Sequence, residues 1–251
     1  MDTPKFFTLI IGTEILNRRR NDAHFDFVSK ELAKYGNKLT GSFVIEDDPK
    51  LIIQSIQYLA SLENSIIFSF GGIGATPDDH TRQCVATALS NGELYTHEEC
   101  ASIIKERLQD KVSPLSLEMA ELPRNAKLIN NVYGSIPAFY LEERFFFLPG
   151  FPHMSHPMIE NILTKFFNTK REIYRYTLTA ACKESFLVDI MKQMPKSVEF
   201  SSLPKSAGRR IWHTTISVAS YDEKISKESF QLYIDKLKAN DIAYNIGEVL
   251  V

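Results

Sequence analysis

Short apolar runs punctuate the first 70 residues of the chain. The runs at 6–11, 39–45 and 65–70 have the length and the β-branched or aromatic composition of buried strands. The stretches between them carry apolar residues at spacings of three and four, which is the period of an amphipathic helix. Strands that alternate with helices predict βαβ crossovers and a mainly parallel sheet with helices on both faces.

Both predicted helices carry boundary signals. The first stops at Gly36, because glycine is favoured just beyond a helix C-terminus. The second starts at Asp48 followed by Pro49, an N-cap residue with a proline in the first turn. The apolar stripes predicted for the two helices are Phe25, Val28, Leu32 and Tyr35, and Ile52, Ile53, Ile56 and Leu59.

A later pair of apolar runs, at 138–141 and 145–148, is predicted to add strands to the same sheet. They lead into a proline-rich loop at 149–152 and a closing helix at 153–167. We therefore expect residues 1–167 to form an α/β domain with three layers and a mainly parallel sheet.

The charged segment 168–175 is a plausible domain boundary, and we expect residues 168–251 to form a separate domain. Its pattern is typical of a small α+β, ferredoxin-like module of the split βαβ kind. The elements expected there are strands at 173–180, 197–203, 211–219 and 243–249, and helices at 185–194 and 227–239.

Composition narrows the functional classes. A net charge of -2 argues against binding to duplex nucleic acid, which usually needs a marked basic excess. The cysteines Cys84, Cys100 and Cys182 are widely spaced and odd in number, so we expect reduced thiols and not a disulfide framework or zinc site. The sequence shows neither a signal peptide nor a membrane span, and a cytoplasmic protein is expected.

Two local features have more than one interpretation. The cationic run at 18–20 fits a phosphate-facing cluster, although a solvated turn is the commoner case for so short a run. Thr76, Pro77 and Asp79 have the spacing of a helix capping box. That cap accounts for Asp79 but not for Asp78, and two adjacent carboxylates can instead bind a divalent cation.

The segment that concentrates candidate chemistry is residues 71–74, three glycines and an isoleucine after a predicted strand. Glycines there permit close backbone approach and expose N–H groups to an anion such as a phosphate. No Gly-Lys-Ser/Thr follows, and Pro77 interrupts the dinucleotide fingerprint, so neither common nucleotide loop is present. Ligands of parallel sheets bind beyond the carboxyl ends of the strands, where residues 12–14 and 149–152 are also expected.

Residues 71–81 (GGIGATPDDHT) look like the GGxGxTxDDxT signature of the molybdopterin-binding domain family and match every fixed position. Residues 11–16 (IGTEIL) resemble the family's first-strand motif, and residues 149–152 (PGFP) resemble its PGxP loop. Asn21-Asp22-Ala23-His24 departs from the Asp-Thr-Asn order usual in relatives. The similarity covers about residues 5–165. It is closer to CinA-like (competence/damage-inducible) proteins and to the N-terminal domain of eukaryotic FAD synthases than to the compact MoaB/MogA proteins.

The resemblance implies a small-molecule, phosphate-containing ligand: molybdopterin, a related pterin or a nucleotide. The residues it assigns to ligand binding are Gly12, Thr13, Gly71, Gly72, Gly74, Thr76, Thr81, Pro149 and Gly150. Longer CinA proteins also carry a nicotinamide-mononucleotide deamidase domain. No residues of this chain are left for it, so no deamidase activity is expected.

Three functions are compatible with the resemblance. One is handling of the molybdenum cofactor, with the pterin phosphate on the amides of 71–74. Another is a nucleotide pyrophosphatase that acts on ADP-ribose or FAD with Mg, Mn or Co; Asp78 and Asp79 would then hold the metal and act in catalysis with Glu14. The third is a non-catalytic module whose C-terminal domain mediates self-association or the docking of a partner, and we expect a homo-oligomer.

Overall fold

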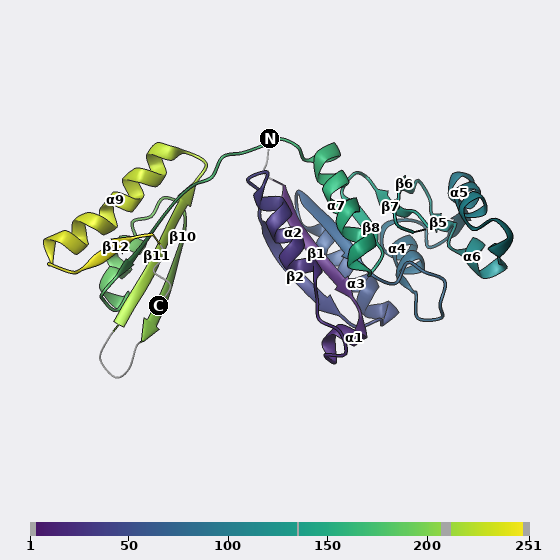
Figure 1. Ribbon diagram of the computed structural model, residues 1–251, viewed down its shortest axis with the longest axis horizontal. Helices are drawn as coiled ribbons and strands as arrows, with labels where there is room; N and C mark the ends of the chain where they lie inside the picture. Colours follow the sequence, from purple (N-terminus) through teal and green to yellow (C-terminus); the bar gives the residue numbers. More distant parts are fainter. Residues whose placement is uncertain (1–3, 135, 207–211, 248–251) are drawn as a thin grey trace. The chain divides into compact units, whose positions relative to one another are not determined.

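The computed structural model describes residues 4–134, 136–206 and 212–247 (Figure 1). Contacts divide the chain into two compact units, Met1–Lys170 and Arg171–Val251, and each is considered by itself. Independent folding of two domains, with a boundary between residues 167 and 168, stays a prediction. Among the described residues, no helix is long and apolar enough to cross a membrane.

The described part of the first unit is built on a six-stranded sheet with the order β2-β1-β3-β8-β7-β6. Its strands are β1 (Lys5–Ile11), β2 (Leu39–Ile45), β3 (Ser65–Phe70), β6 (Lys127–Ile129), β7 (Ala138–Leu141) and β8 (Phe145–Leu148). The first four positions of that order are parallel to one another, whereas β7 and β6 extend the sheet in antiparallel fashion. The predicted mainly parallel α/β sheet is confirmed.

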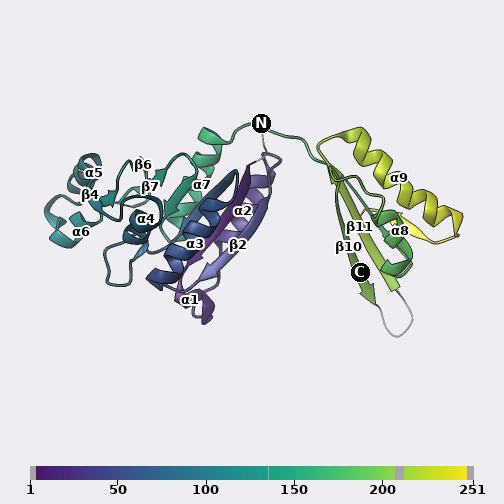
Figure 2. The same ribbon diagram turned by 180° about the vertical axis from the view of Figure 1, so that it is seen from behind.

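Helices cover both faces of this sheet, as Figures 1 and 2 show from opposite sides. α2 packs beside α7 on one face, and α3 packs beside α4 on the other. Strands β3 and β8 are buried along their whole length, which is what an apolar run between two helical layers requires. The helices of this unit are α1 (Thr13–Leu16), α2 (His24–Ala33), α3 (Pro49–Ser61), α4 (Thr81–Leu89), α5 (Glu98–Leu108), α6 (Pro114–Glu118) and α7 (Pro152–Phe166).

Local signals placed several boundaries correctly. The Asp48 carboxylate accepts a 2.7 Å hydrogen bond from the Leu51 N–H, so it caps α3 as predicted. Residues 90–134, in contrast, fold into short elements that hydrophobic periodicity did not predict. Besides α5, α6 and β6, they are η1 (Gln109–Lys111), β4 (Leu94–Thr96) and β5 (Glu121–Pro123). A three-residue strand is too short for its alternation to stand out from chance.

The second unit has an antiparallel sheet with the order β10-β11-β9-β12, against which α9 packs. This is the split βαβ arrangement that the sequence predicted. The helix expected at 185–194 is instead a 3-10 turn and one short helix that ends at Met191, after which the N–H groups of Gln193 and Met194 bond three residues back in tight turns. The expected strand ends at Ile211 and Val249 lie outside the described residues. The described elements of the second unit are β9 (Tyr174–Ala180), η2 (Glu184–Leu187), α8 (Val188–Met191), β10 (Glu199–Ser206), β11 (Trp212–Ser220), α9 (Glu223–Ala239) and β12 (Tyr244–Ile246).

Candidate functional site

The carboxyl ends of β1, β2, β3 and β8 meet at one edge of the sheet because these strands are parallel neighbours. The loops that follow them enclose a pocket of about 450 Å³. The site residues predicted from the sequence that line it are Glu14, Gly71, Gly72, Gly74, Thr76, Asp78, Asp79, Pro149 and Gly150. The structure therefore brings together three loops that are up to 130 residues apart in the chain.

Three residues that the resemblance assigned to ligand binding do not line this pocket: Gly12, Thr13 and Thr81. Thr81 is buried, and its hydroxyl donates a 2.9 Å hydrogen bond to the Gly71 carbonyl. The Thr13 N–H and hydroxyl donate to Asp47 Oδ2 at 2.8 and 2.9 Å. The geometry gives these residues a supporting position, in which they hold the loops that carry the pocket.

The glycine loop owes its shape to tight packing. Gly71 has φ +103° and Gly72 has φ +66°, a region that other residues rarely adopt. A Cβ on Gly71 would collide with the Ile11 carbonyl, and one on Gly72 would collide with the Thr81 hydroxyl. These two glycines are therefore needed by the protein's own packing, before any ligand arrives.

Four successive amides of this loop are left without a partner. Among the residues that the structure describes, no hydrogen bond is donated by the N–H groups of Gly72, Ile73, Gly74 or Ala75. Successive backbone N–H groups of this kind form a concave site for an anion. The loop thus has the donors that phosphate binding requires.

The predicted capping box at Thr76–Asp79 is wrong. The Asp79 carboxylate does accept from the Thr76 N–H at 2.8 Å and from the Thr76 hydroxyl, but α4 begins only at Thr81. The helix N-cap is His80, which makes no side-chain cap hydrogen bond. The Asp79 N–H donates back to the Thr76 carbonyl at 2.9 Å, so these contacts close a separate turn ahead of the helix.

Four carboxylates line the pocket: Glu14, Asp47, Asp78 and Asp79. Asp78 is exposed, and interaction with the Thr76 side chain is the main cause that holds its pKa below the ordinary value. In the described part of the chain, no three His, Cys, Asp or Glu side chains converge as ligands for one metal ion. A metal here would need further ligands from a bound molecule. Asp47 was not predicted, although its position just after the parallel strand β2 is the signal that could have found it.

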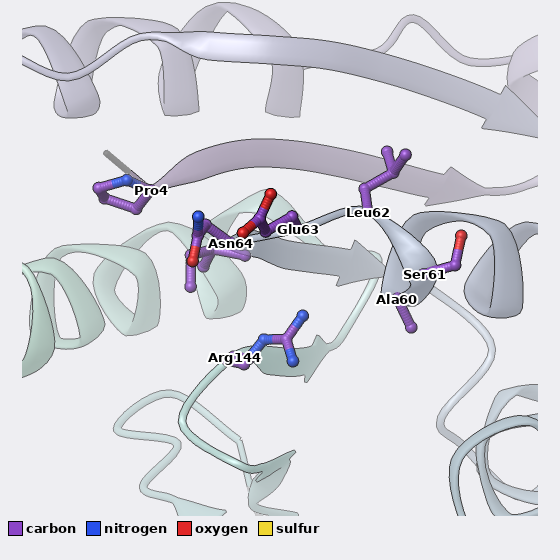
Figure 3. Close-up of a pocket in the computed structure, with 8 residues that line it drawn as sticks. Pro4, Ala60, Ser61, Leu62, Glu63, Asn64 and Arg144 are labelled. Atoms are coloured by element: carbon purple, nitrogen blue, oxygen red, sulfur yellow. The ribbon is translucent and has the colours of Figure 1, made fainter. Parts of the chain in front are cut away.

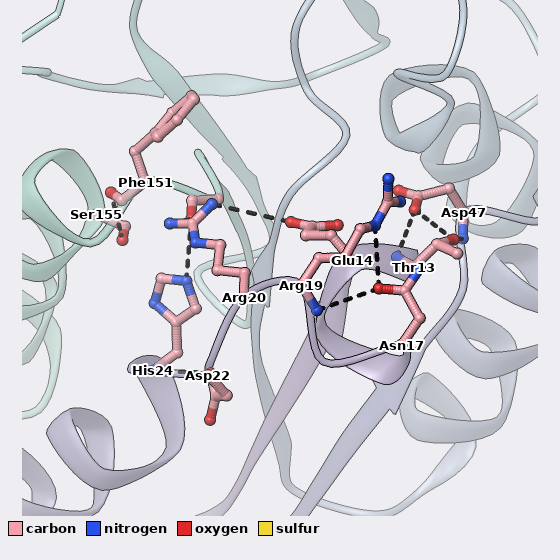
Figure 4. Close-up of polar contacts among 11 residues, drawn as sticks. Thr13, Glu14, Asn17, Arg19, Arg20, Asp22, His24, Asp47, Phe151 and Ser155 are labelled. Carbon is pink, nitrogen blue, oxygen red and sulfur yellow. Dashed lines mark hydrogen bonds and ion pairs between the residues drawn. The ribbon is translucent and has the colours of Figure 1, made fainter.

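The cationic run at 18–20 divides between solvent and site. Arg18 and Arg19 are exposed, whereas Arg20 lines the pocket. Figure 4 shows the Arg20 side chain directed toward Glu14, and Arg19 beside Asn17. Arg20 Nη2 donates a 2.9 Å hydrogen bond to the Gly150 carbonyl, and Arg20 Nη1 lies 3.8 Å from Glu14 Oε1. Neither interpretation of the run is therefore right for all three residues.

A buried histidine shares the Gly150 carbonyl with Arg20. His24 Nε2 lies 3.3 Å from that oxygen, and the imidazole stacks on Phe70 with ring centroids 4.1 Å apart. Burial is the main cause that lowers the pKa of His24 to about 4, so the ring is neutral at pH 7. A neutral ring can donate from Nε2, which ties the loop after β8 to the start of α2, beside the end of β3.

The remaining side chains of the lining are mainly apolar and come in part from the segment 90–134, which hydrophobic periodicity did not predict. They include Met119, Asn131, Ile136, Phe151 and Met154. Two arginines secure the surrounding backbone. Arg82 donates from Nη2 to the Gly74 carbonyl at 3.0 Å, and Arg107 donates from Nη1 to the carbonyls of Asn131 and Gly134 at 2.6 and 2.7 Å.

A second depression of about 470 Å³ lies at the other edge of the sheet, near the amino ends of β1, β3 and β8 (Figure 3). Its cation, Arg144, already donates to the carbonyl and hydroxyl of Ser65 at 3.1 Å each. Ligands of parallel sheets bind at the carboxyl ends of the strands. The first pocket is therefore the stronger candidate site.

Comparison with known proteins places this geometry in a family. The family model described as "Probable molybdopterin binding domain" matches residues 7–169. A CinA-like protein of Flavobacterium psychrophilum is 25% identical over 243 residues; the alignment covers 91% of this chain but only 57% of that relative. A protein of Pyrococcus furiosus is 27% identical, with 95% of this chain and 98% of the relative covered.

Among solved structures, a CinA protein of unknown function from Thermoplasma acidophilum matches with a TM-score of 0.58. It is 24% identical, and the match covers 64% of this chain and 97% of that one. At this identity the match supports the fold, and it leaves the ligand and the chemistry to be argued from the pocket.

Proposed function

The chain belongs to the molybdopterin-binding domain family, and from that premise we propose that its pocket binds a phosphate-bearing pterin or nucleotide. The observation that carries this proposal is the run of four free amides from Gly72 to Ala75. Each of these N–H groups would donate a hydrogen bond to a phosphate oxygen. A ligand without an acceptor would bury these N–H groups unpaired, which costs free energy, so the loop favours a ligand that brings acceptor oxygens.

The remainder of the pocket suits the other half of such a molecule. A volume of about 450 Å³ is in the range of small-molecule sites. Phe151, Ile136 and the thioethers of Met119 and Met154 present a face for a planar ring, and Asn131 places a polar group beside it. A ring with a phosphate tail is therefore the ligand class that we propose.

Hydrolysis of a nucleotide pyrophosphate is the second candidate, favoured by the carboxylates that surround the glycine loop. A divalent cation would supply a Lewis acid at the phosphates. Asp78 and Asp79 offer carboxylate oxygens, and the ligand's phosphates would complete a ligand set that the described residues do not form by themselves. One oxygen of Asp79, Oδ2, already accepts from the Thr76 N–H and hydroxyl, so Asp78 is the more available of the two.

Titration calorimetry of the full chain with molybdopterin, FAD and ADP-ribose tests the proposal, with and without Mg, Mn or Co. We expect saturable binding of at least one compound, and chromatography of the mixtures would reveal any hydrolysis. If a folded protein binds none of the three under any condition, the proposed function is wrong. Binding without product would remove only the hydrolase candidate.

A matched pair of glycine variants tests the loop. In Gly74→Ala the new Cβ would meet Asp79 Oδ2 and stand before the free amides, so we expect affinity to fall about tenfold or more. Gly92→Ala introduces a side chain at φ +84°, where nothing lies within 4 Å of the new Cβ. We expect that control to bind as the wild type does. Equal affinity of all three proteins would place the phosphate elsewhere.

A further inference from the structure

The side chains that line the pocket carry more negative than positive charge. The lining includes four carboxylates, and among the described residues that line the pocket Arg20 is the single cationic side chain. Arg82 interacts with Asp79 from behind the glycine loop but does not line the pocket. A phosphate that enters such a site meets repulsion from like charges, which weakens binding unless a cation lies close to it. Backbone amides carry only partial charges, so the glycine loop offsets this repulsion in part.

Arg20 is held beside the glycine loop. Its Nη2 donates to the Gly150 carbonyl at 2.9 Å, and Gly150 packs on Gly71 so closely that a Cβ there would lie 3.3 Å from the Gly71 Cα. The guanidinium also lies 5.5 Å from the centre of the Phe151 ring. Backbone and aromatic contacts thus fix the guanidinium between the phosphate end and the ring end of the pocket.

Most of the donor capacity of Arg20 is unused. A guanidinium has five N–H donors in a planar fork that matches phosphate oxygens. The contact with Glu14 is 3.8 Å, too long for a hydrogen bond, and the two side chains are 34% and 38% exposed. Figure 4 shows Arg20 directed between Glu14 and Phe151, so an incoming anion can reach it from solvent.

We propose that Arg20 releases Glu14 and binds the phosphate of the ligand, and that it thereby selects phosphorylated ligands over their unphosphorylated counterparts. This rests on the proposed function of the same pocket. Without a ligand, the Glu14 carboxylate occupies the position beside Arg20 that the phosphate would take, and it binds the guanidinium only weakly. When the phosphate displaces Glu14, the guanidinium gains a stronger acceptor and keeps its hydrogen bond to the Gly150 carbonyl.

The chain provides a matched control. Arg19 is the next residue and carries the same charge, but it is exposed, and its Nε donates to Asn17 Oδ1 at 3.1 Å. It does not line the pocket. Arg19→Met therefore removes the same charge from the same loop, and a long-range effect of net charge would appear equally in Arg19→Met and Arg20→Met.

Titration calorimetry with two probes, inorganic pyrophosphate and ADP-ribose, tests the proposal. In Arg20→Met we expect affinity for both probes to fall tenfold to a hundredfold, on the order of one charge-assisted contact. Arg20→Lys should recover part of that loss, and Arg19→Met should match the wild type. The affinity of the wild type should also fall more steeply with added salt than that of Arg20→Met. Unchanged unfolding temperatures would establish that all the variants are folded.

A double-mutant cycle with Glu14→Gln tests whether Glu14 competes with the phosphate for the Arg20 guanidinium or only repels the phosphate. If the carboxylate competes with phosphate for the guanidinium, Glu14→Gln should raise pyrophosphate affinity several-fold more in the wild type than in Arg20→Met. Equal effects in both backgrounds would mean that Glu14 acts only through general repulsion, and the displacement step would be overturned.

The outcomes distinguish this inference from the function it rests on. If the wild type binds a probe and Arg20→Met binds it equally well, Arg20 has no part in recognition, while the proposed function stands. If the folded wild type binds neither pyrophosphate nor ADP-ribose, and fails with molybdopterin and FAD too, the proposed function fails and this inference fails with it. Should it bind only the latter two, Arg20→Met must lower those affinities, or the inference is wrong.

Discussion

Mild acid should destabilise the first unit through one buried side chain, His24. The ring is 2% exposed, its Nδ1 has no partner among the described residues, and burial lowers its pKa from 6.5 to about 4. An unfolded chain therefore takes up a proton on this residue at a pH where the folded chain does not. The neutral, buried ring therefore places no proton-binding cost on the folded state above about pH 7, and the free energy of unfolding falls as the pH drops from 6.5 toward 4.

The magnitude follows from the two pKa values. A difference of about 2.5 units corresponds to about 3 kcal/mol once the pH is below both pKa values, and to about 2 kcal/mol between pH 7 and pH 5. The comparison of two pH values within each protein removes the constant cost of losing the contacts with Phe70 and Gly150. His156, whose pKa is also lowered by burial, is retained in the variant and so contributes to both proteins.

Urea unfolding of wild type and His24→Gln at pH 7 and pH 5, followed by circular dichroism, measures the effect. We expect the free energy of unfolding to drop between these pH values by about 2 kcal/mol less in His24→Gln than in the wild type. His153→Gln is the control, since that histidine is exposed on α7 and should leave the wild-type drop intact. Equal drops in wild type and His24→Gln would refute the reasoning.

Three further predictions concern the acids, Arg82 and the domain boundary. If the protein hydrolyses a nucleotide pyrophosphate, Asp78→Asn should lower the rate at least about a hundredfold. Asp79→Asn should also lower the unfolding temperature, because Asp79 closes the turn with Thr76. If neither substitution changes the rate, neither carboxylate acts in catalysis. Arg82→Met should lower the free energy of unfolding by about 3 kcal/mol, because the carbonyls of Gly74, Glu118 and Glu121 lose the charged donor of a buried arginine; denaturant titration measures this, and a loss below about 1 kcal/mol would contradict it. Limited proteolysis should cut first near residues 168–172 and leave a folded fragment 1–167; early cuts deep in the first 160 residues would count against that boundary.

Much of the first unit could be predicted because its signals are local and repeated. The strands β1, β3 and β8 are mainly apolar runs, β2 alternates between half-buried and exposed positions, and the helix after Asp48 has both a cap and a stripe. The segment 90–134 gave no such signal. Its short elements are ordered by distant partners instead, as when Arg107 on α5 donates to the Asn131 and Gly134 carbonyls more than twenty residues later.

The sequence by itself determined which loops form the pocket, since parallel strands bring their carboxyl ends to one edge, and the glycine run after β3 made that edge the candidate for an anion site. Only the tertiary structure decided which neighbouring side chain lines the pocket. Arg19 and Arg20 are equivalent in sequence, but Arg20 alone reaches the Gly150 carbonyl, 130 residues away. The same non-local packing brought Asp47 into the pocket lining and placed the Thr81 hydroxyl on the Gly71 carbonyl. The physical reason is that side-chain direction in an irregular loop depends on contacts made across the fold, and those contacts leave no period in the sequence.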